Sequence, residues 1–354
     1  MKISINSTFS YIKFNLNYGS ALQCYALQQY LKNRGHDASH IRDYRANPAF
    51  LLPKLKNIKY FKQFWEKVGG LIKLQKFIRK NLSLSERGYL SYSSMVKHCP
   101  KADCHIAGSD QIWKNANNFR YLTYAPDDKL KLSYAASFGR RVISDEMKAE
   151  IKPYLERLDG ISVREKSGVE IINSIGFDAV HVLDPALLLD YEQYPYAENG
   201  KDNYYFCYFL NLRDRNSVPF ETIKSIASNN NKELVLTAPL NYYLFRDENV
   251  QFPSVEDWLG YYKNADCIFT NTFHGLLFCI VFKKQFVHFL QDNNENERFY
   301  SILSLLGLED RLLKDPSREE IEALMNKTID YDAVYEKVNE QRKITDNYFK
   351  QFGI

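Results

Sequence analysis

Short apolar segments of strand length alternate with segments of helical periodicity along most of this chain. In the first unit, a strand over 1–6 is followed by a polar turn, a helix over 20–31 and a strand over 38–44. Strand–helix–strand units of this kind pack as parallel sheets that are covered by helices. The alternation therefore predicts an α/β fold with open sheets.

The length of the chain predicts two domains. It has 354 residues, and a single hydrophobic core stops growing at roughly 250–300. A spacer over 190–202, rich in Tyr, Pro, Glu and Gly, interrupts the alternation. We predict an N-terminal domain over 1–189, a C-terminal domain over 190–330, and a polar helix over 331–354 that packs back on the first domain.

A basic helical insert over 51–88 breaks the alternation. Between Leu51 and Lys80 there are eight lysines and Arg79 against the single acid Glu66, interleaved with aromatic and aliphatic residues. Such a segment is typical first of a solvated lysine face on a helical insert, and also of a peripheral contact with an anionic membrane. We predict no nucleic-acid partner, because no recognised motif accompanies the charge and the net charge is only +4.

Neither a metal site nor a membrane span is predicted. The six cysteines are scattered, and Cys104-His105-Ile106-Ala107 has the composition of a strand rather than a zinc signature. No window approaches the roughly 20 apolar residues of a membrane span, and the N-terminus lacks the apolar core of a signal peptide. We therefore expect a cytoplasmic protein without a metal.

A strand, a polar turn and a helix over 266–282 form a candidate active-site corner. Cys267 to Phe269 fit a buried strand, Thr270 to Thr272 offer N-cap oxygens, and His274 falls in the first helical turn. Unpaired N–H groups and the helix dipole favour an anion there and hold down the pKa of an imidazole. The alternative is a histidine that only caps its helix.

Two further strand ends carry charged side chains. Asp110 follows a strand and a glycine turn in 106–113, where open α/β sheets bind ligands. Arg164 follows the strand over 161–163, and its guanidinium suits a carboxylate or phosphate. The alternatives are that Asp110 caps the N–H groups of its own turn and that Arg164 pairs with Glu165 or another acid.

In this order, the motifs resemble those of the polysaccharide pyruvyl transferase family. The matching segments are 17–19, 108–113, 133–139, 162–165, 184–186, 272–275 and 296–298. The resemblance implies two Rossmann-like domains that face a cleft, which is the glycosyltransferase B (GT-B) architecture. It also implies that the second domain holds the donor and the first domain the acceptor.

The implied reaction moves the enolpyruvyl group of phosphoenolpyruvate onto two hydroxyls of one sugar in a cell-surface or capsular polysaccharide precursor. The products are a pyruvate ketal and phosphate, and no cofactor is implied. The family motifs place these residues at the site: catalytic His274 and Asp110; donor-binding Arg164, Arg298, Thr272 and Gly275; acceptor-binding Asn17, Tyr18, Gly19, Ser109 and Gln111. Many relatives carry an acid where this chain has Ser20, so Asp110 is our candidate base.

Two other functions are compatible with the sequence. The first is a glycosyltransferase that uses a nucleotide-sugar donor on the same architecture. The second is a carbohydrate-binding or scaffold protein without turnover, against which Arg164, Asp110 and His274 argue. For the pyruvyl transferase, we expect the acceptor to be a sugar on a lipid carrier at the inner membrane face.

Overall fold

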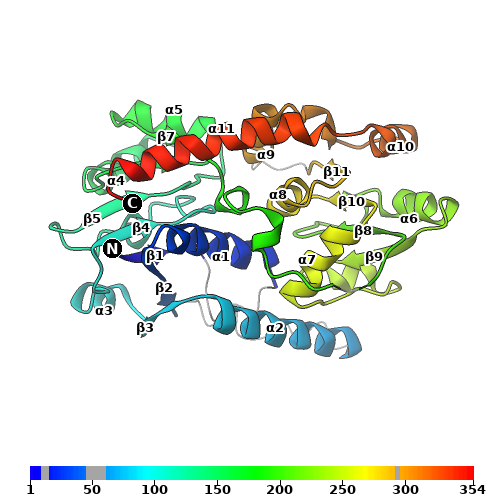
Figure 1. Cartoon of the computed structure of the whole chain (residues 1–354), viewed down its shortest axis with the longest axis horizontal. Coiled ribbons are helices and arrows are strands. Elements are labelled where there is room, and N and C mark those ends of the chain that lie inside the picture. The colour runs from blue at the N-terminus through cyan, green and yellow to red at the C-terminus, as the bar shows by residue number, and fades with distance from the viewer. Residues whose placement is uncertain (9–15, 45–60, 199, 292–295) are drawn as a thin grey trace.

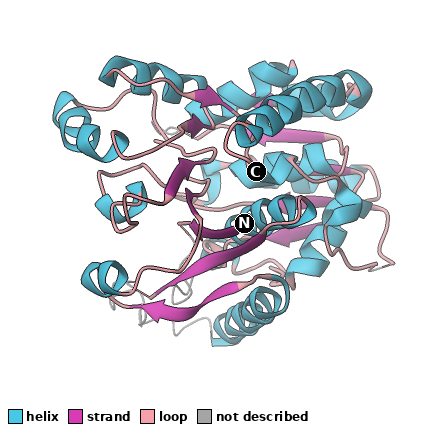
Figure 2. Cartoon of the chain, turned by 60° about the vertical axis from the view of Figure 1, so that its left-hand side comes forward, coloured by secondary structure: helices cyan, strands magenta, loops and turns pink. Residues whose placement is uncertain are grey.

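Two parallel five-stranded sheets, each flanked by helices, make up this computed structural model (Figures 1 and 2). The structure describes residues 1–8, 16–44, 61–198, 200–291 and 296–354. The sheets confirm the predicted α/β fold with two Rossmann-like domains. The connection from β7 to β8 spans 182–203 and contains the predicted spacer.

The N-terminal sheet has the strand order β3-β2-β1-β4-β5, and all neighbours are parallel. This order places β1 at the centre, where the chain first winds to one side and then to the other. The pair β6-β7 continues the sheet through bridges from Leu132 to Gly160 and from Ala136 to Val163. The elements are β1 (Lys2–Asn6), α1 (Tyr18–Asn33), β2 (Asp37–Asp43), α2 (Phe61–Asn81), β3 (Leu84–Tyr89), α3 (Tyr92–Lys97), β4 (Cys104–Ala107), β5 (Leu130–Ser133), α4 (Asp145–Leu155), β6 (Ser162–Val163), α5 (Lys166–Ile175) and β7 (Val180–His181).

The C-terminal sheet has the order β12-β11-β10-β8-β9 and is also parallel. Here the winding direction changes between β8 and β10. The elements are β8 (Tyr204–Tyr208), α6 (Phe220–Asn229), β9 (Glu233–Thr237), α7 (Val255–Asn264), β10 (Cys267–Thr270), α8 (Phe273–Val281), β11 (Phe286–Phe289), α9 (Glu297–Leu306), β12 (Leu312–Leu313), α10 (Arg318–Asn326) and α11 (Tyr331–Lys350).

The predicted basic insert differs from the observed structure at its C-terminal end. Residues 84–88 lie in the edge strand β3, which pairs with β2 from Leu84 to Tyr89. Burial of Leu82 and Tyr89 fixes this strand against the sheet, and no helical pattern continues there. Residues 51–60 of the insert lie outside the described part of the chain, and α2 supplies the rest.

Helix α11 runs along both domains (Figure 1). Its first half contacts the end of α8, where the Tyr331 hydroxyl donates to the Cys279 carbonyl at 3.2 Å. Its second half reaches the first domain, where the Tyr348 hydroxyl donates to the Ser133 carbonyl at 2.8 Å. The helix therefore ties the two sheets together. None of the described helices is long and apolar enough to cross a membrane.

Candidate active site

A cleft lies between the two sheets, at the places where the chain changes its winding direction in each sheet. In open parallel sheets, ligands bind outside the carboxyl ends of the strands at such a point. Segments that follow β1, β4, β8 and β10 line this cleft together with the start of α9, and its volume is about 420 Å³. Of the predicted site residues, the lining contains His274, Asp110, Arg298, Thr272, Asn17 and Gln111.

The segment that follows β10 forms one wall of the cleft, and it contains the N-terminus of α8. Thr272 is the N-cap, and its hydroxyl accepts a hydrogen bond from the Gly275 N–H at 2.9 Å. Gly275 has no room for a side chain, because a Cβ there would lie 2.3 Å from the hydroxyl oxygens of Thr270 and Thr272. Gly275 therefore allows the Thr272 cap to form, and it lies behind the residues that line the cleft. The capped helix end offers an N-terminal dipole to an anion in the cleft.

His274 lies on this helix end with only 8% of its surface exposed. Burial lowers the pKa of its imidazole, and the cations of Arg164 and Arg298 add to this effect, while Asp184 and Asp110 oppose it. The imidazole is therefore neutral at neutral pH in the unliganded protein. Its Nε2 lies 3.8 Å from Oδ2 of Asp184, so a carboxylate is close enough to stabilise the charged form when a proton arrives.

Gly19 allows the two domains to meet at this histidine. A Cβ on Gly19 would lie 2.2 Å from the Cβ of His274 and 2.5 Å from its ring. The first turn of α1, whose N-cap is Asn17, thus packs directly against the first turn of α8. The acceptor-binding role that the family resemblance implies for Gly19 remains a prediction, whereas its contact with His274 makes it a positioning residue.

Tyr18, the next predicted acceptor residue, is buried between the domains. Its hydroxyl donates to the Pro253 carbonyl at 3.0 Å, and its ring stacks on Trp258 with a centroid separation of 5.4 Å. Both contacts are with the second domain. Tyr18 therefore fixes the relative position of the domains and does not line the cleft.

Arg164 lies behind the cleft wall in a buried cluster of charges. Its Nε donates to Glu165 at 3.0 Å and its Nη1 to Asp184 at 2.7 Å. Ser109, predicted to contact the acceptor, instead donates to the same Asp184 oxygen at 3.1 Å. The structure thus shows the pairing of Arg164 with acids that the sequence left open. Asp184 was absent from the predicted site residues, although it belongs to the matching segment 184–186.

Phe273 separates Arg164 from the open cleft. Its ring centroid lies 4.2 Å from the guanidinium carbon of Arg164 and 5.6 Å from that of Arg298. Arg298 lines the cleft, while Arg164 borders a void of about 10 Å³, roughly the size of one water molecule. Arg298 is therefore the arginine that a ligand in the cleft meets directly.

Asp110 occupies a strained turn after β4. Its φ of 70° is in the left-handed region, and its two carboxylate oxygens accept from the Gln111 N–H at 2.9 Å and the Thr8 hydroxyl at 3.0 Å. Burial alone would raise its pKa, but His274, Arg164 and the Gln111 N–H lower it. Asp110 is thus a carboxylate at neutral pH that caps its turn and also lines the cleft.

Asn211 lines the cleft and was not predicted from the sequence. It follows β8 with a φ of 55°. The side chain of Asn271 holds the backbone of Leu210 through bonds of 3.0 and 2.8 Å, and that of Asn241 holds Leu212 through bonds of 3.0 and 2.9 Å. Two buried amides therefore fix a left-handed residue between them. The only sequence signal is an asparagine directly after an apolar strand.

Substitution of Asn211 tests whether this loop presents a ligand contact. Asn211→Gly keeps the left-handed backbone and removes the side chain, so we expect an unchanged melting temperature and a weaker ligand affinity, by about 5- to 10-fold for one lost hydrogen bond. The matched control is Asn231→Gly, another left-handed asparagine, which lies outside the cleft lining. Ligand affinity equal to that of the unmodified protein in both variants would reject the contact.

No group of three His, Cys, Asp or Glu residues in the described ranges is arranged to hold a metal ion. Charged and polar side chains line the cleft together with the N-terminus of α8. Lys114 and Arg298 are its cationic lining residues, and the carboxamides of Asn17, Gln111 and Asn211 are among its neutral hydrogen-bonding groups. This combination suits an anionic ligand next to a hydroxyl-rich one.

Comparison with known proteins identifies a family from the sequence and a shared fold from the structure. The profile of the family described as polysaccharide pyruvyl transferase matches residues 17–293. A sequence comparison with curated proteins gives no significant match.

The structure is similar to S. aureus MnaA in a UDP co-structure, with a TM-score of 0.53, 12% identity, and coverage of 99% of this chain and 96% of that one. It is also similar to Methanocaldococcus jannaschii UDP-GlcNAc 2-epimerase in complex with UDP-GlcNAc and UDP. That match has a TM-score of 0.53, 14% identity, and coverage of 96% of this chain and 99% of that one. At these identities the similarity shows the shared GT-B fold alone.

Proposed function

Because this chain belongs to the polysaccharide pyruvyl transferase family, we propose that it transfers the enolpyruvyl group of phosphoenolpyruvate to a sugar. The acceptor is a precursor of a cell-surface or capsular polysaccharide, and the products are a pyruvate ketal and phosphate. One observation carries the proposal. The capped N-terminus of α8, with His274 in its first turn, faces the same cleft as Arg298 and Asp110.

The donor side of the proposal rests on complementary charge. Phosphoenolpyruvate carries a phosphate and a carboxylate, and the cleft offers Arg298, Lys114 and the positive end of α8. Negative charge beside His274 favours its protonated form and so raises the imidazole pKa that burial had lowered. Binding of the donor would thus protonate His274, the general acid that then acts on the donor.

The balanced reaction needs two proton transfers and no oxidant. The methylene carbon of the enol gains one proton and becomes the ketal methyl group. Each acceptor hydroxyl forms a C–O bond to the central carbon, and the bond between that carbon and the phosphate oxygen breaks. Of the two hydroxyl protons, one goes to the methyl group and one leaves with phosphate. His274 is the proton donor, and Asp110 is the carboxylate that accepts from an acceptor hydroxyl.

The acceptor side follows from the first domain. Asn17 and Gln111 offer amide donors and acceptors next to Asp110, which matches the needs of sugar hydroxyls. We propose a sugar on a lipid carrier at the cytoplasmic face of the membrane as the acceptor. Mass spectrometry of lipid-linked or nitrophenyl sugars after incubation with phosphoenolpyruvate would detect the pyruvyl increment.

A nucleotide-sugar donor is the second candidate, because two structures with this fold contain UDP. Thermal-shift measurements distinguish the two donors. We expect phosphoenolpyruvate to raise the melting temperature in proportion to the logarithm of its excess over the dissociation constant. Stabilisation by UDP-sugars with no response to phosphoenolpyruvate would contradict the proposed donor and favour a glycosyltransferase.

A further inference from the structure

Helix α2 packs across both domains with one face. Its Leu71, Leu74 and Phe77 are buried in the core, and the amino group of Lys73 donates to the Phe252 carbonyl of the second domain at 3.2 Å. Gly70 lies against Leu16 and Phe252. The helix is therefore held against the protein along its length, and its opposite face points outward.

The outward face carries large apolar side chains among cations. Trp65 is 55% exposed and Ile72 is 53% exposed. They are seven residues apart, so they share one side of the helix. Lys76, Arg79 and Lys80 continue the same stripe toward the C-terminus and are exposed. We call Trp65, Ile72, Lys76, Arg79 and Lys80 the α2 face.

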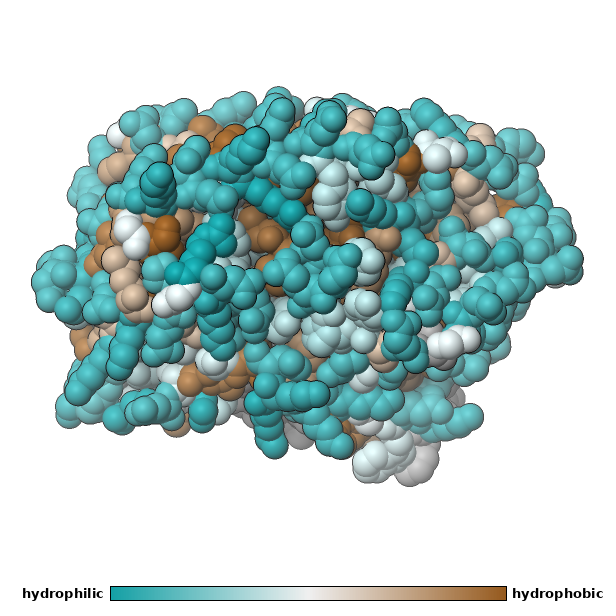
Figure 3. Space-filling view, viewed as in Figure 1, coloured by the Kyte–Doolittle hydropathy of each residue, from teal (hydrophilic) through white to brown (hydrophobic). Residues whose placement is uncertain are grey.

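Both components of this face match one kind of partner. Hydrophilic residues cover most of the surface in Figure 3, so an exposed tryptophan and isoleucine on one stripe require an explanation. A tryptophan and an aliphatic residue insert at the depth of lipid headgroups, and lysine and arginine contact anionic lipids while their stems cover apolar surface. A protein surface that binds nucleic acid needs cations for the phosphates, but an exposed isoleucine adds little to such binding.

We propose that the α2 face docks this protein on a bilayer that contains anionic lipid. The charge complementarity is direct, because Glu66 is the only acid among the residues of α2. Docking through a helix that contacts both domains holds the protein at the surface without a transmembrane segment. The proposal is independent of the transferred group and would stand if the donor were a nucleotide sugar.

The chain provides its own fluorescent probe for this docking. Trp113 and Trp258 are fully buried, so Trp65 is the tryptophan whose surroundings change when a surface binds. We expect a blue shift of tryptophan emission, and flotation of the protein, with vesicles of phosphatidylglycerol and phosphatidylcholine at low salt. Vesicles of phosphatidylcholine alone should give neither.

Three double variants make the experiment specific. We expect K76E/R79E and W65S/I72S to abolish flotation, because each removes one component of the α2 face. The control K343E/K350E makes the same charge change on exposed residues of α11, which lies on the opposite side of the molecule (Figure 1), and should float as the unmodified protein does. All substituted residues are exposed, so melting temperatures should not change.

Two results would overturn the proposal. The first is no flotation of the unmodified protein with anionic vesicles at low salt. The second is equal loss in the α2 and α11 variants, which would mean attraction by net charge alone. A Trp65 shift with single-stranded RNA but none with anionic vesicles counts as the first result and assigns the face to nucleic acid. Since the assay contains neither donor nor acceptor, its failure leaves the proposed reaction untouched.

Discussion

H274A is expected to lower the rate of phosphate release from phosphoenolpyruvate by about 100- to 10,000-fold, the range of a lost general acid. The side chain is buried at the first turn of α8, and its Nε2 lies 3.8 Å from Oδ2 of Asp184. Its removal leaves the cap of Thr272 intact, so the fold should persist. A coupled phosphate assay at saturating donor and acceptor measures the effect.

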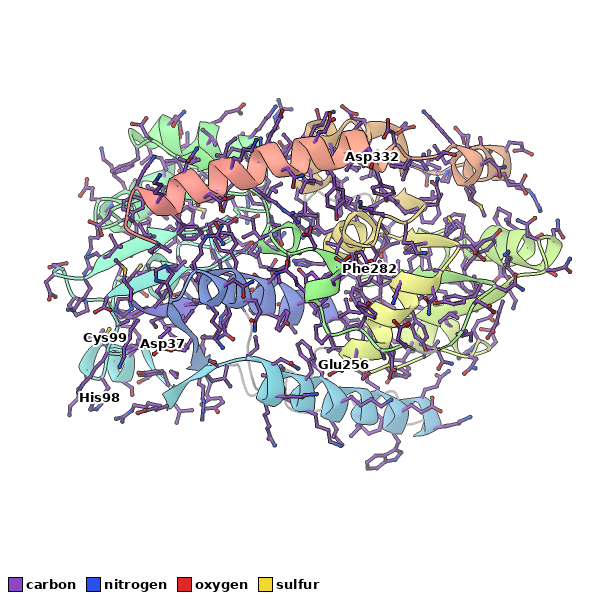
Figure 4. The ribbon with its side chains drawn as sticks, in the orientation of Figure 1. Asp37, His98, Cys99, Glu256, Phe282 and Asp332 are labelled. Carbon is purple, nitrogen blue, oxygen red and sulfur yellow. The ribbon has the colours of Figure 1, made fainter. Side chains whose placement is uncertain are left out.

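The glutamine variant and a distant histidine provide the controls. H274Q retains a hydrogen-bonding group of similar size that cannot be protonated, so it should be nearly as inactive as H274A. H98A removes a histidine at the outer end of the first domain, far from the labelled Phe282 of the second domain (Figure 4), and should retain full activity. An active H274A would reject the proton-donor role.

The pH dependence of donor binding tests whether His274 becomes protonated in the complex. Burial lowers the pKa of His274, so the free protein holds it neutral at neutral pH, and a bound dianion raises this pKa. Donor binding should therefore take up protons, and affinity should increase as pH falls through the raised pKa of the complex toward the lower pKa of the free protein. Calorimetry in buffers of different ionisation enthalpy measures the uptake. H274Q should lose the part of the uptake that belongs to the imidazole.

R164A is expected to destabilise the protein by about 3–5 kcal/mol, because it leaves Glu165 and Asp184 buried without their cation. Urea unfolding followed by circular dichroism measures the loss. The matched control is R318A, whose ion pair with Glu322 is partly exposed and should cost less than about 1 kcal/mol. The double variant R164A/D184N should lose less than the sum of the two single variants, since the residues share one interaction.

The same variants decide between two roles of Arg164. As a positioning residue, it holds Asp184 close to His274, and its loss should lower stability and turnover together. If R164A instead folds with the stability of the unmodified protein and loses only affinity for phosphoenolpyruvate, Arg164 is a direct donor ligand. That result would require Phe273 to leave its place between Arg164 and the cleft.

Most elements of the fold follow from local sequence patterns. The helix predicted over 331–354 appears as α11, which ends at Lys350, and the strand, polar turn and helix over 266–282 appear as β10, Thr272 and α8. These predictions succeed because strand composition, helical periodicity and N-cap chemistry act within a few residues. Residues 84–88 form a strand and not the predicted helix, because they pair with β2 at the edge of the sheet. This pairing depends on tertiary structure and not on the local sequence.

For the candidate site too, some features follow from local sequence patterns and others only from the tertiary structure. The sequence by itself determined that His274, Asp110 and Thr272 stand at strand ends or at the start of a helix, because local patterns reveal these elements, and the family resemblance added Arg298. Tertiary structure alone decided which side chains reach the cleft: Asn211 enters it, while Arg164 and Tyr18 pack behind it. The physical reason is distance along the chain. Tyr18 meets Trp258, and Gly19 meets His274, only after both sheets have formed and their helix N-termini have packed together.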